Sequence, residues 1–126
     1  MRTLKLKVVH RILLSGILNV EGTKEGYGLK ALSDMLKVFD KINFTQEETA
    51  LLKIRQEDNQ MKWDAAKENE DGSKEEIDIE KEFEVSNDQA DLLKEIFKKK
   101  DEKKEFTLSG LNPIVEIADQ IGYEIK

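Results

Sequence analysis

The chain has 126 residues with 21 basic and 27 acidic side chains, a formal net charge of −6, one histidine, one proline, one tryptophan and no cysteine. This composition suits a single domain over residues 1–126, and it excludes disulfide scaffolds, thiolate metal sites, iron–sulfur clusters, cysteine nucleophiles and multi-histidine metal cages. The apolar fraction of 38% is too high for a disordered chain, and no apolar run reaches the roughly 18–20 residues that span a membrane.

The charge is distributed unevenly along the chain. Residues 1–20 carry four basic side chains and no acidic one, whereas residues 61–88 carry four basic and eleven acidic side chains. The basic start and the short apolar stretch behind it lack the small-residue cleavage site of a signal peptide. We therefore expect a cytoplasmic protein (in the host cytoplasm if phage-encoded) with an amphipathic first helix.

The N-terminal part predicts a short extended segment followed by two helices. Apolar residues alternate over positions 3–8 with the period of a strand, although a helix there stays open. From Val9 the apolar spacing becomes helical, a glycine-containing loop is expected over residues 19–28, and a second helix follows. The expected inward residues are Val9, Ile12, Leu13 and Ile17 in the first helix, and Leu29, Leu32, Leu36 and Phe39, widened by Met35, Val38 and Ile42, in the second.

The middle of the chain predicts a capped turn, a hairpin, a loop and a strand. Thr45 and Glu48 form a capping box, and Asp58-Asn59 suits the turn of a β-hairpin. Residues 64–76 have no periodicity and read as an exposed, flexible loop. Apolar and charged residues then alternate strictly over Ile77–Val85, which predicts a half-buried edge strand with an acidic outer face.

Two further helices are predicted in the C-terminal part. Ser86 and Gln89 form a second capping box, and the lysines at positions 98–104 complement the dipole at the end of that helix. The last helix is expected to begin with Asn112 as its cap and to end at Gly122. The expected inward residues are Ala90, Leu93, Ile96 and Phe97, then Ile114, Val115, Ile117, Ala118 and Ile121.

These elements together predict an α+β fold in the order (β)ααβββαα. Because the strands are few and consecutive, we expect a small antiparallel β-meander of about three strands, packed with about four to five helices on one side.

No catalytic, cofactor-binding or metal-binding residues emerge from the sequence. His10 has no acid nearby in sequence and is expected to be a surface or partly buried helical histidine. The glycines of residues 22–28 match no nucleotide-binding motif, and no calcium-binding loop is present. We therefore expect a protein that is not an enzyme and needs no cofactor.

Binding of another protein is the function that remains. The candidate features are the acidic block Glu68–Glu84, with Glu80, Glu82 and Glu84 on one strand face, and the loop Gly22–Gly28, which contains Tyr27. Trp63 is expected to belong to the core rather than to a binding surface.

A winged-helix-like nucleic-acid-binding protein is the alternative, since two helices, a short capped helix and a hairpin follow one another in that order. The basic residues of the N-terminus would then contact phosphate: Arg2, Lys5, Lys7 and Arg11. The acidic residues Glu47 and Glu48 in the candidate recognition helix, and the acidic tip of the hairpin, oppose this interpretation.

The order of motifs resembles a family of small uncharacterised phage and prophage proteins. The matching segments cover most of the chain: Leu4-Lys5-Leu6, Ile12 to Glu21-Gly22, Leu29 to Phe39, Phe44-Thr45-Gln46-Glu47-Glu48, Lys62-Trp63, Glu82-Phe83-Glu84-Val85-Ser86, and Leu92-Leu93-Lys94 to Lys103-Lys104. The chain departs from the family at Asn19, where a loop proline is common. The resemblance implies a phage or prophage origin and assigns no activity and no residue roles.

Overall fold

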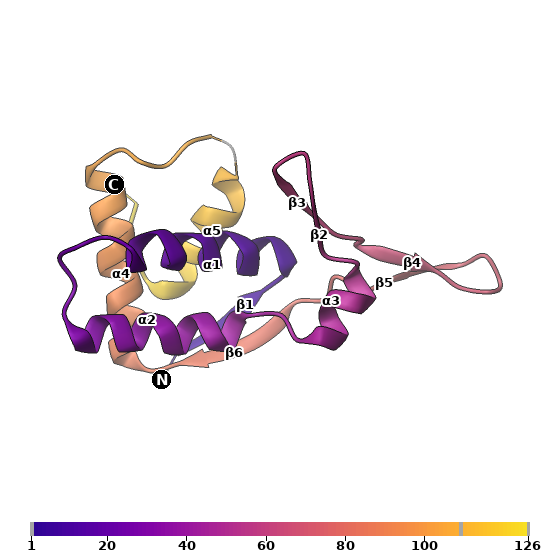
Figure 1. Cartoon of the computed structure of the whole chain (residues 1–126), viewed down its shortest axis with the longest axis horizontal. Helices are drawn as coiled ribbons and strands as arrows, with labels where there is room; N and C mark the ends of the chain where they lie inside the picture. The colour runs from indigo at the N-terminus through magenta and orange to yellow at the C-terminus, as the bar shows by residue number, and fades with distance from the viewer. Residues whose placement is uncertain (1, 109, 126) are drawn as a thin grey trace.

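A computed structural model describes residues 2–108 and 110–125 (Figure 1). The fold is of the α+β class, as the sequence predicts. The elements in chain order are β1 (Arg2–Leu6), α1 (Val8–Gly22), α2 (Leu29–Ile42), α3 (Gln46–Leu52), β2 (Arg55–Glu57), β3 (Gln60–Lys62), β4 (Ala66–Glu68), β5 (Lys74–Glu76), β6 (Lys81–Val85), α4 (Asn87–Glu102) and α5 (Leu111–Ile121).

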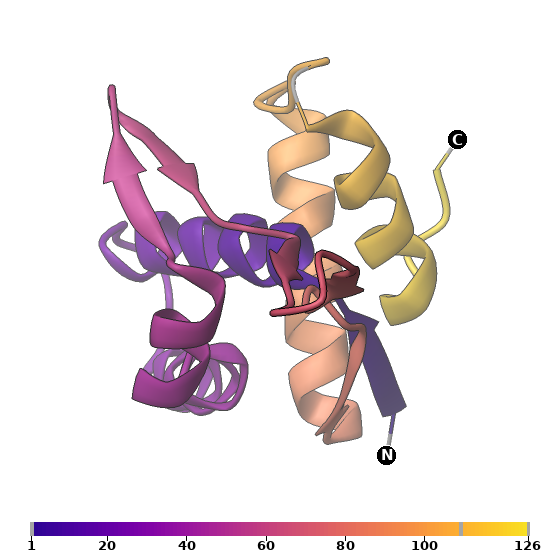
Figure 2. The same cartoon turned by 90° about the vertical axis from the view of Figure 1, so that its right-hand side faces the viewer.

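The body of the molecule is a ring of four helices with a two-stranded ribbon beside it. Helix α1 packs against α2 and α5, and α4 also packs against α2 and α5, while β1 lies along α5. Figures 1 and 2 show α4 running across the direction of α1 and α2. The hairpins β2–β3 and β4–β5 (residues 55–76) extend away from this body and form what we call the hairpin arm. They contribute no residue to the core of the body.

The strands do not form the expected meander. They form three separate antiparallel pairs, β1–β6, β2–β3 and β4–β5. In the β1–β6 pair, Leu4 lies opposite Phe83 and Lys5 opposite Glu82. The outer edge of β1 is closed by the side-chain amide of Gln120, which bonds both the N–H and the carbonyl of Lys5. The prediction of a meander was wrong because β6 pairs with the first strand of the chain rather than with its sequence neighbour.

The buried face of α1 differs from the predicted one. Its buried residues include Arg11, Leu14, Leu18 and Glu21, whereas the predicted inward residues of this helix are only half-buried. The apolar pattern misplaced the face because Arg11 and Glu21, which are charged, belong to the buried side of the helix. The helix also continues to Gly22, so the expected loop is shorter than predicted.

Helix α2 buries only one side of its predicted apolar stripe. Met35, Val38 and Ile42 are buried, whereas Leu29 and Leu36, both predicted to face inward, are 88% and 60% exposed. The apolar stripe of α2, formed by Leu29, Leu32, Leu36 and Phe39, therefore lies at the surface or at its edge.

The hairpin β2–β3 has the predicted turn. Asp58 and Asn59 both have positive φ angles, 52° and 63°, as a two-residue type I′ turn requires. Residues 64–76, predicted as an irregular loop, contain the second hairpin, β4–β5. Both faces of this hairpin meet solvent, so no alternation of apolar and polar residues marks it.

Asp78 ties the hairpin arm to the body. One carboxylate oxygen accepts from the backbone N–H of Val8 at 3.0 Å, at the start of α1, and the other accepts from the indole of Trp63 at 3.3 Å. The strand predicted from Ile77 therefore begins only at Lys81, because the chain first crosses the N-terminus of α1. Trp63, expected in the core, is half-buried outside it.

The C-terminal helices follow the predicted capping signals with one exception. The Ser86–Gln89 and Thr45–Glu48 capping boxes both form. The residue before α5 is Gly110, at a φ of 73°, and not Asn112, which lies inside the helix. The four predicted inward residues of α4 are buried, but Val115 of α5 is exposed.

Candidate functional site

Arg11 and Glu48 form a buried ion pair at the junction of α1, α2 and α3. The guanidinium Nη1 and Nη2 donate to the Glu48 carboxylate at 2.6 and 3.0 Å. Nε donates to the carbonyl of Ile42 at 2.9 Å, and Nη2 donates to that of Asn43 at 2.9 Å. Arg11 thus satisfies carbonyls at the end of α2 that the helix itself leaves unpaired.

Aromatic rings and a lysine complete this ion pair. The Arg11 guanidinium lies 4.1 Å from the ring centre of Phe44 and 5.0 Å from that of Phe83. Lys81 donates to the same carboxylate at 2.6 Å. The hydrogen bonds from Arg11 lower the pKa of Glu48 far below its ordinary 4.5; burial opposes this, and Lys81 reinforces it.

We expect the ion pair to make stability depend on acidic pH. Because the folded state lowers the pKa of Glu48, its contribution is fully present above pH 4.5 and is lost as the pH falls through the folded-state value. Urea unfolding of wild type and Glu48→Gln should therefore differ most at neutral pH and converge as the pH falls below 4.5. Glu47→Gln removes the same charge from an exposed neighbour and serves as the control; an equal pH dependence of both differences would contradict the assignment.

His10 is buried and has a carboxylate partner that lies far away in the sequence. Its Nδ1 accepts from the backbone N–H of Lys7 at 3.0 Å, so the ring proton lies on Nε2, which is 2.9 Å from a carboxylate oxygen of Glu116. Both ring nitrogens are thus engaged, which gives His10 a role in fixing the start of α1 against α5.

The basic residues predicted for nucleic-acid contact do not form one surface. Arg11 lies in the interior, so its prediction as a phosphate contact is wrong. Arg2 donates to the carbonyl of Gln120 at 2.7 Å, and Lys7 lies 3.8 Å from Glu76. Lys5 is exposed, opposite Glu82 on the neighbouring strand.

The residues predicted for protein contact lie in two separate places. Glu80, Glu82 and Glu84 are exposed along β6 and the segment before it. The ring of Tyr27 lies 4.6 Å from the ammonium of Lys99, late in α4, whereas β6 leads into the start of that helix. At 1.5 Å per residue, these two regions of α4 are about 18 Å apart. The structure therefore does not bring Tyr27 and the acidic strand together.

Tyr27 belongs to a buried polar cluster. Its hydroxyl donates to Glu21 at 2.6 Å, and Lys24 donates to the same carboxylate at 3.0 Å. Burial raises the pKa of Tyr27, and the hydrogen bond to Glu21 raises it further. Burial opposes ionisation of Glu21, but the bonds from Tyr27 and Lys24 outweigh it and lower its pKa. These contacts hold the α1–α2 loop in place.

The described parts of the chain hold neither a cluster of metal ligands nor a membrane-spanning helix. Over residues 2–108 and 110–125, no three His, Cys, Asp or Glu side chains are grouped so that they could hold a metal ion. Within the same residues, no helix has the length and apolar character needed to cross a membrane.

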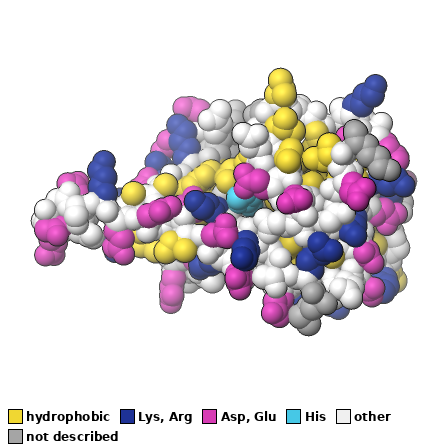
Figure 3. Space-filling model, turned by 180° about the vertical axis from the view of Figure 1, so that it is seen from behind, with side chains coloured by type: hydrophobic (Ala, Val, Ile, Leu, Met, Phe, Trp, Pro, Cys, Tyr) yellow, Lys and Arg dark blue, Asp and Glu magenta, His cyan; other side chains and the backbone are white. Residues whose placement is uncertain are grey.

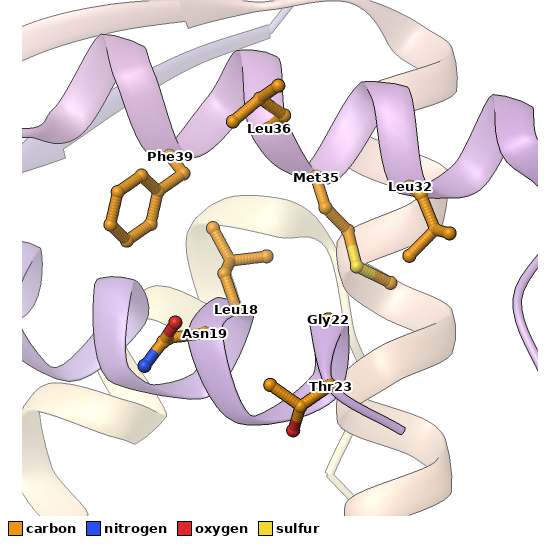
Figure 4. A pocket seen from close by; sticks show the side chains of 8 residues that line it. All are labelled: Leu18, Asn19, Gly22, Thr23, Leu32, Met35, Leu36 and Phe39. Atoms are coloured by element: carbon orange, nitrogen blue, oxygen red, sulfur yellow. The ribbon is translucent and has the colours of Figure 1, made fainter. Parts of the chain in front are cut away.

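The apolar stripe of α2 borders a groove between α1 and α2. The groove has a volume of 280 Å³, and Figure 4 shows the side chains of Leu18, Met35 and Phe39 in the space between the two helices. Leu32 and Leu36 line it from α2, with Asn19, Gly22 and Thr23 on the α1 side. The apolar spacing of α2 predicted that its residues belong to the core and gave no indication of the groove. The spacing alone cannot say which of two adjacent apolar faces is buried.

Comparison of the chain with known protein families, characterised proteins and solved structures found no match. The resemblance to phage and prophage proteins therefore stays a prediction.

Proposed function

We propose that this chain is a cytoplasmic, non-enzymatic protein of the phage type that its sequence resembles, and that it acts by binding another protein through the α1–α2 groove. The observation that carries the proposal is the apolar stripe of α2, in which Leu29 and Leu36 are exposed and Leu32 and Phe39 are half-buried. Large apolar side chains that stay at the surface beside a groove are a common mark of an interaction site.

The spacing of the stripe favours a helical partner. Leu29, Leu32, Leu36 and Phe39 follow one another at intervals of three, four and three residues. This is the a/d spacing with which one helix meets another along a seam. With α1 as the second wall, a partner helix would lie in the α1–α2 groove, as amphipathic helices do in grooves of other proteins.

A nucleic-acid-binding role has less support. One of the four basic residues it needs is buried. Arg2 donates a hydrogen bond and Lys7 forms an ion pair within the same chain, and the projecting arm is rich in carboxylates. Phosphate would be repelled by that arm.

We expect Leu36→Asp to abolish partner binding without unfolding the protein. The side chain is 60% exposed, so its replacement should change stability by no more than about 0.5 kcal/mol. Tagged wild type, Leu36→Asp and Ile79→Asp are compared by quantitative affinity capture from host cells. The control residue Ile79 is 64% exposed in the segment between β5 and β6, and it does not line the groove. A partner should be retained by wild type and Ile79→Asp and lost by Leu36→Asp.

The captured partner is then purified and titrated against the three proteins by calorimetry. We expect at least about a tenfold loss of affinity for Leu36→Asp, as for a residue in the centre of an interface. Equal affinity of all three proteins would contradict the groove, and a salt-sensitive mobility shift with duplex or single-stranded DNA would favour the alternative function.

A further inference from the structure

A second apolar surface lies where α5 meets the end of α4 and the C-terminal segment. Ile125 is 60% exposed, and Leu111 and Val115, which line the same hollow, are also exposed; Leu108, shortly before α5 in the chain, is 87% exposed. Figure 3 shows hydrophobic side chains gathered at the top of the face seen there. Such a cluster of large exposed apolar side chains is unusual for a surface with no binding role.

A pocket opens within this apolar surface. It has a volume of 230 Å³, and its lining includes Phe97, Phe106, Ile114 and Tyr123. The ring of Phe97 lies 5.7 Å from that of Phe106 and 6.5 Å from that of Tyr123, so aromatic rings form much of its wall. The hydroxyl of Tyr123 donates to Asp101 at 2.6 Å, which places a carboxylate at the rim. The pocket has the size and character to receive one apolar side chain of a partner.

An acidic trough adjoins the pocket. Glu116, Asp119 and Glu124 line it, together with Val115, Tyr123 and Ile125, which also line the apolar pocket. No lysine or arginine is present between residues 105 and 125 of the chain. Arg2 and Lys94 approach the trough at Gly122, where Arg2 donates to the carbonyl of Gln120.

We propose that the apolar pocket and the acidic trough together bind a basic amphipathic helix of a partner protein. An apolar side chain of that helix fills the pocket, and lysine or arginine side chains on its flank meet the carboxylates of the trough. The carboxylates disfavour nucleic acid and anionic lipid surfaces, and they favour a cationic partner over an acidic one.

This surface is separate from the α1–α2 groove, since no residue lines both. The proposal therefore stands or falls independently of the proposed function. A protein with both surfaces could hold two helices at once.

The probe is a fluorescent peptide of about 18 residues, with leucines at helical spacing on one face and lysines on the other. Its binding to the full chain is followed by fluorescence anisotropy at about 0.05 and 0.3 M NaCl. We expect a dissociation constant in the micromolar range at low salt and at least a fivefold rise at high salt, because exposed charges are screened. The counterpart with glutamates in place of the lysines should not bind.

Matched variants separate this surface from general attraction to an acidic protein. Val115→Asp should weaken binding about tenfold, as loss of an interface anchor does, whereas Ile79→Asp, between β5 and β6 and outside the pocket and the trough, should leave it unchanged. Asp119→Lys should weaken binding about fivefold, whereas Asp71→Lys makes the same charge change on the arm and should have no effect. Ile125→Asp replaces Val115→Asp if the latter does not fold.

Three results would overturn the proposal. The first is equal binding of the acidic and basic peptides, and the second is an equal effect of the surface variants and their controls. The third is a concentration-dependent dimer in sedimentation that Val115→Asp abolishes, because a second copy of the chain would then cover the surface.

Discussion

Replacement of Arg11 by alanine is expected to lower the free energy of unfolding by about 3–5 kcal/mol, the usual cost of removing one partner of a buried ion pair. The substitution leaves the Glu48 carboxylate without its main partner and removes the donors that Arg11 supplies to the carbonyls of Ile42 and Asn43. It also removes the cation between two aromatic rings. Urea unfolding followed by circular dichroism measures the loss.

Two controls make this prediction specific. Arg55→Ala removes an arginine that bonds Glu57 and Asp64 on the exposed arm, and it should lower the free energy of unfolding far less than Arg11→Ala does. Arg11→Met keeps the length of the side chain but not its hydrogen-bond donors, so its free energy of unfolding should be close to that of Arg11→Ala. If Arg11→Met matched wild type, packing rather than pairing would explain the role of the residue.

Replacement of Phe97 by alanine is expected to cost about 3–5 kcal/mol, the range found for buried aromatic residues. Phe97 is 1% exposed and contacts the rings of Phe106 and Tyr123, so its removal leaves a cavity between α4 and α5. Phe106→Ala at the half-buried neighbouring position should cost clearly less. Urea midpoints of the two variants at the same temperature give the comparison.

Phe97→Ala also bears on the surface beside α5. The Phe97 side chain forms part of the pocket wall, so its loss should lower the affinity for the basic peptide in addition to the free energy of unfolding. If Phe97→Ala and Phe106→Ala lost equal stability, the deeper burial of Phe97 would not explain the cost of its removal.

Features with a local cause could be predicted from the sequence. Both capping boxes and the Asp58-Asn59 turn form as expected, because each depends on backbone groups within a few residues. The α4 face was also correct, since its apolar residues point to one side and its polar residues to the other.

Features that depend on distant residues could not be predicted in the same way. The α1 face was misjudged because Arg11 and Glu21 are buried, and the partners that allow this, Glu48 and Tyr27, lie in other segments. The partner of His10 is 106 residues away, at Glu116. No pattern within a single helix carries that information.

The candidate surfaces were missed for a related reason. Leu36 and Val115 both satisfy helical spacing, and spacing treats a surface stripe and a core stripe alike. Only the packing of the neighbouring helices shows which stripe is covered.

The pairing of β1 with β6 has a consequence for how the chain can change in length. This pair closes a loop that begins at Leu6 and ends at Lys81, and the whole hairpin arm lies within that loop. The entropy cost of closing a flexible loop grows only with the logarithm of its length, so a doubling costs about 0.6 kcal/mol. Because the arm adds nothing to the core, residues can be inserted or removed at the tip of β4–β5 with little change in folding equilibrium. The arm is thus the part of this protein where sequence length is free to vary.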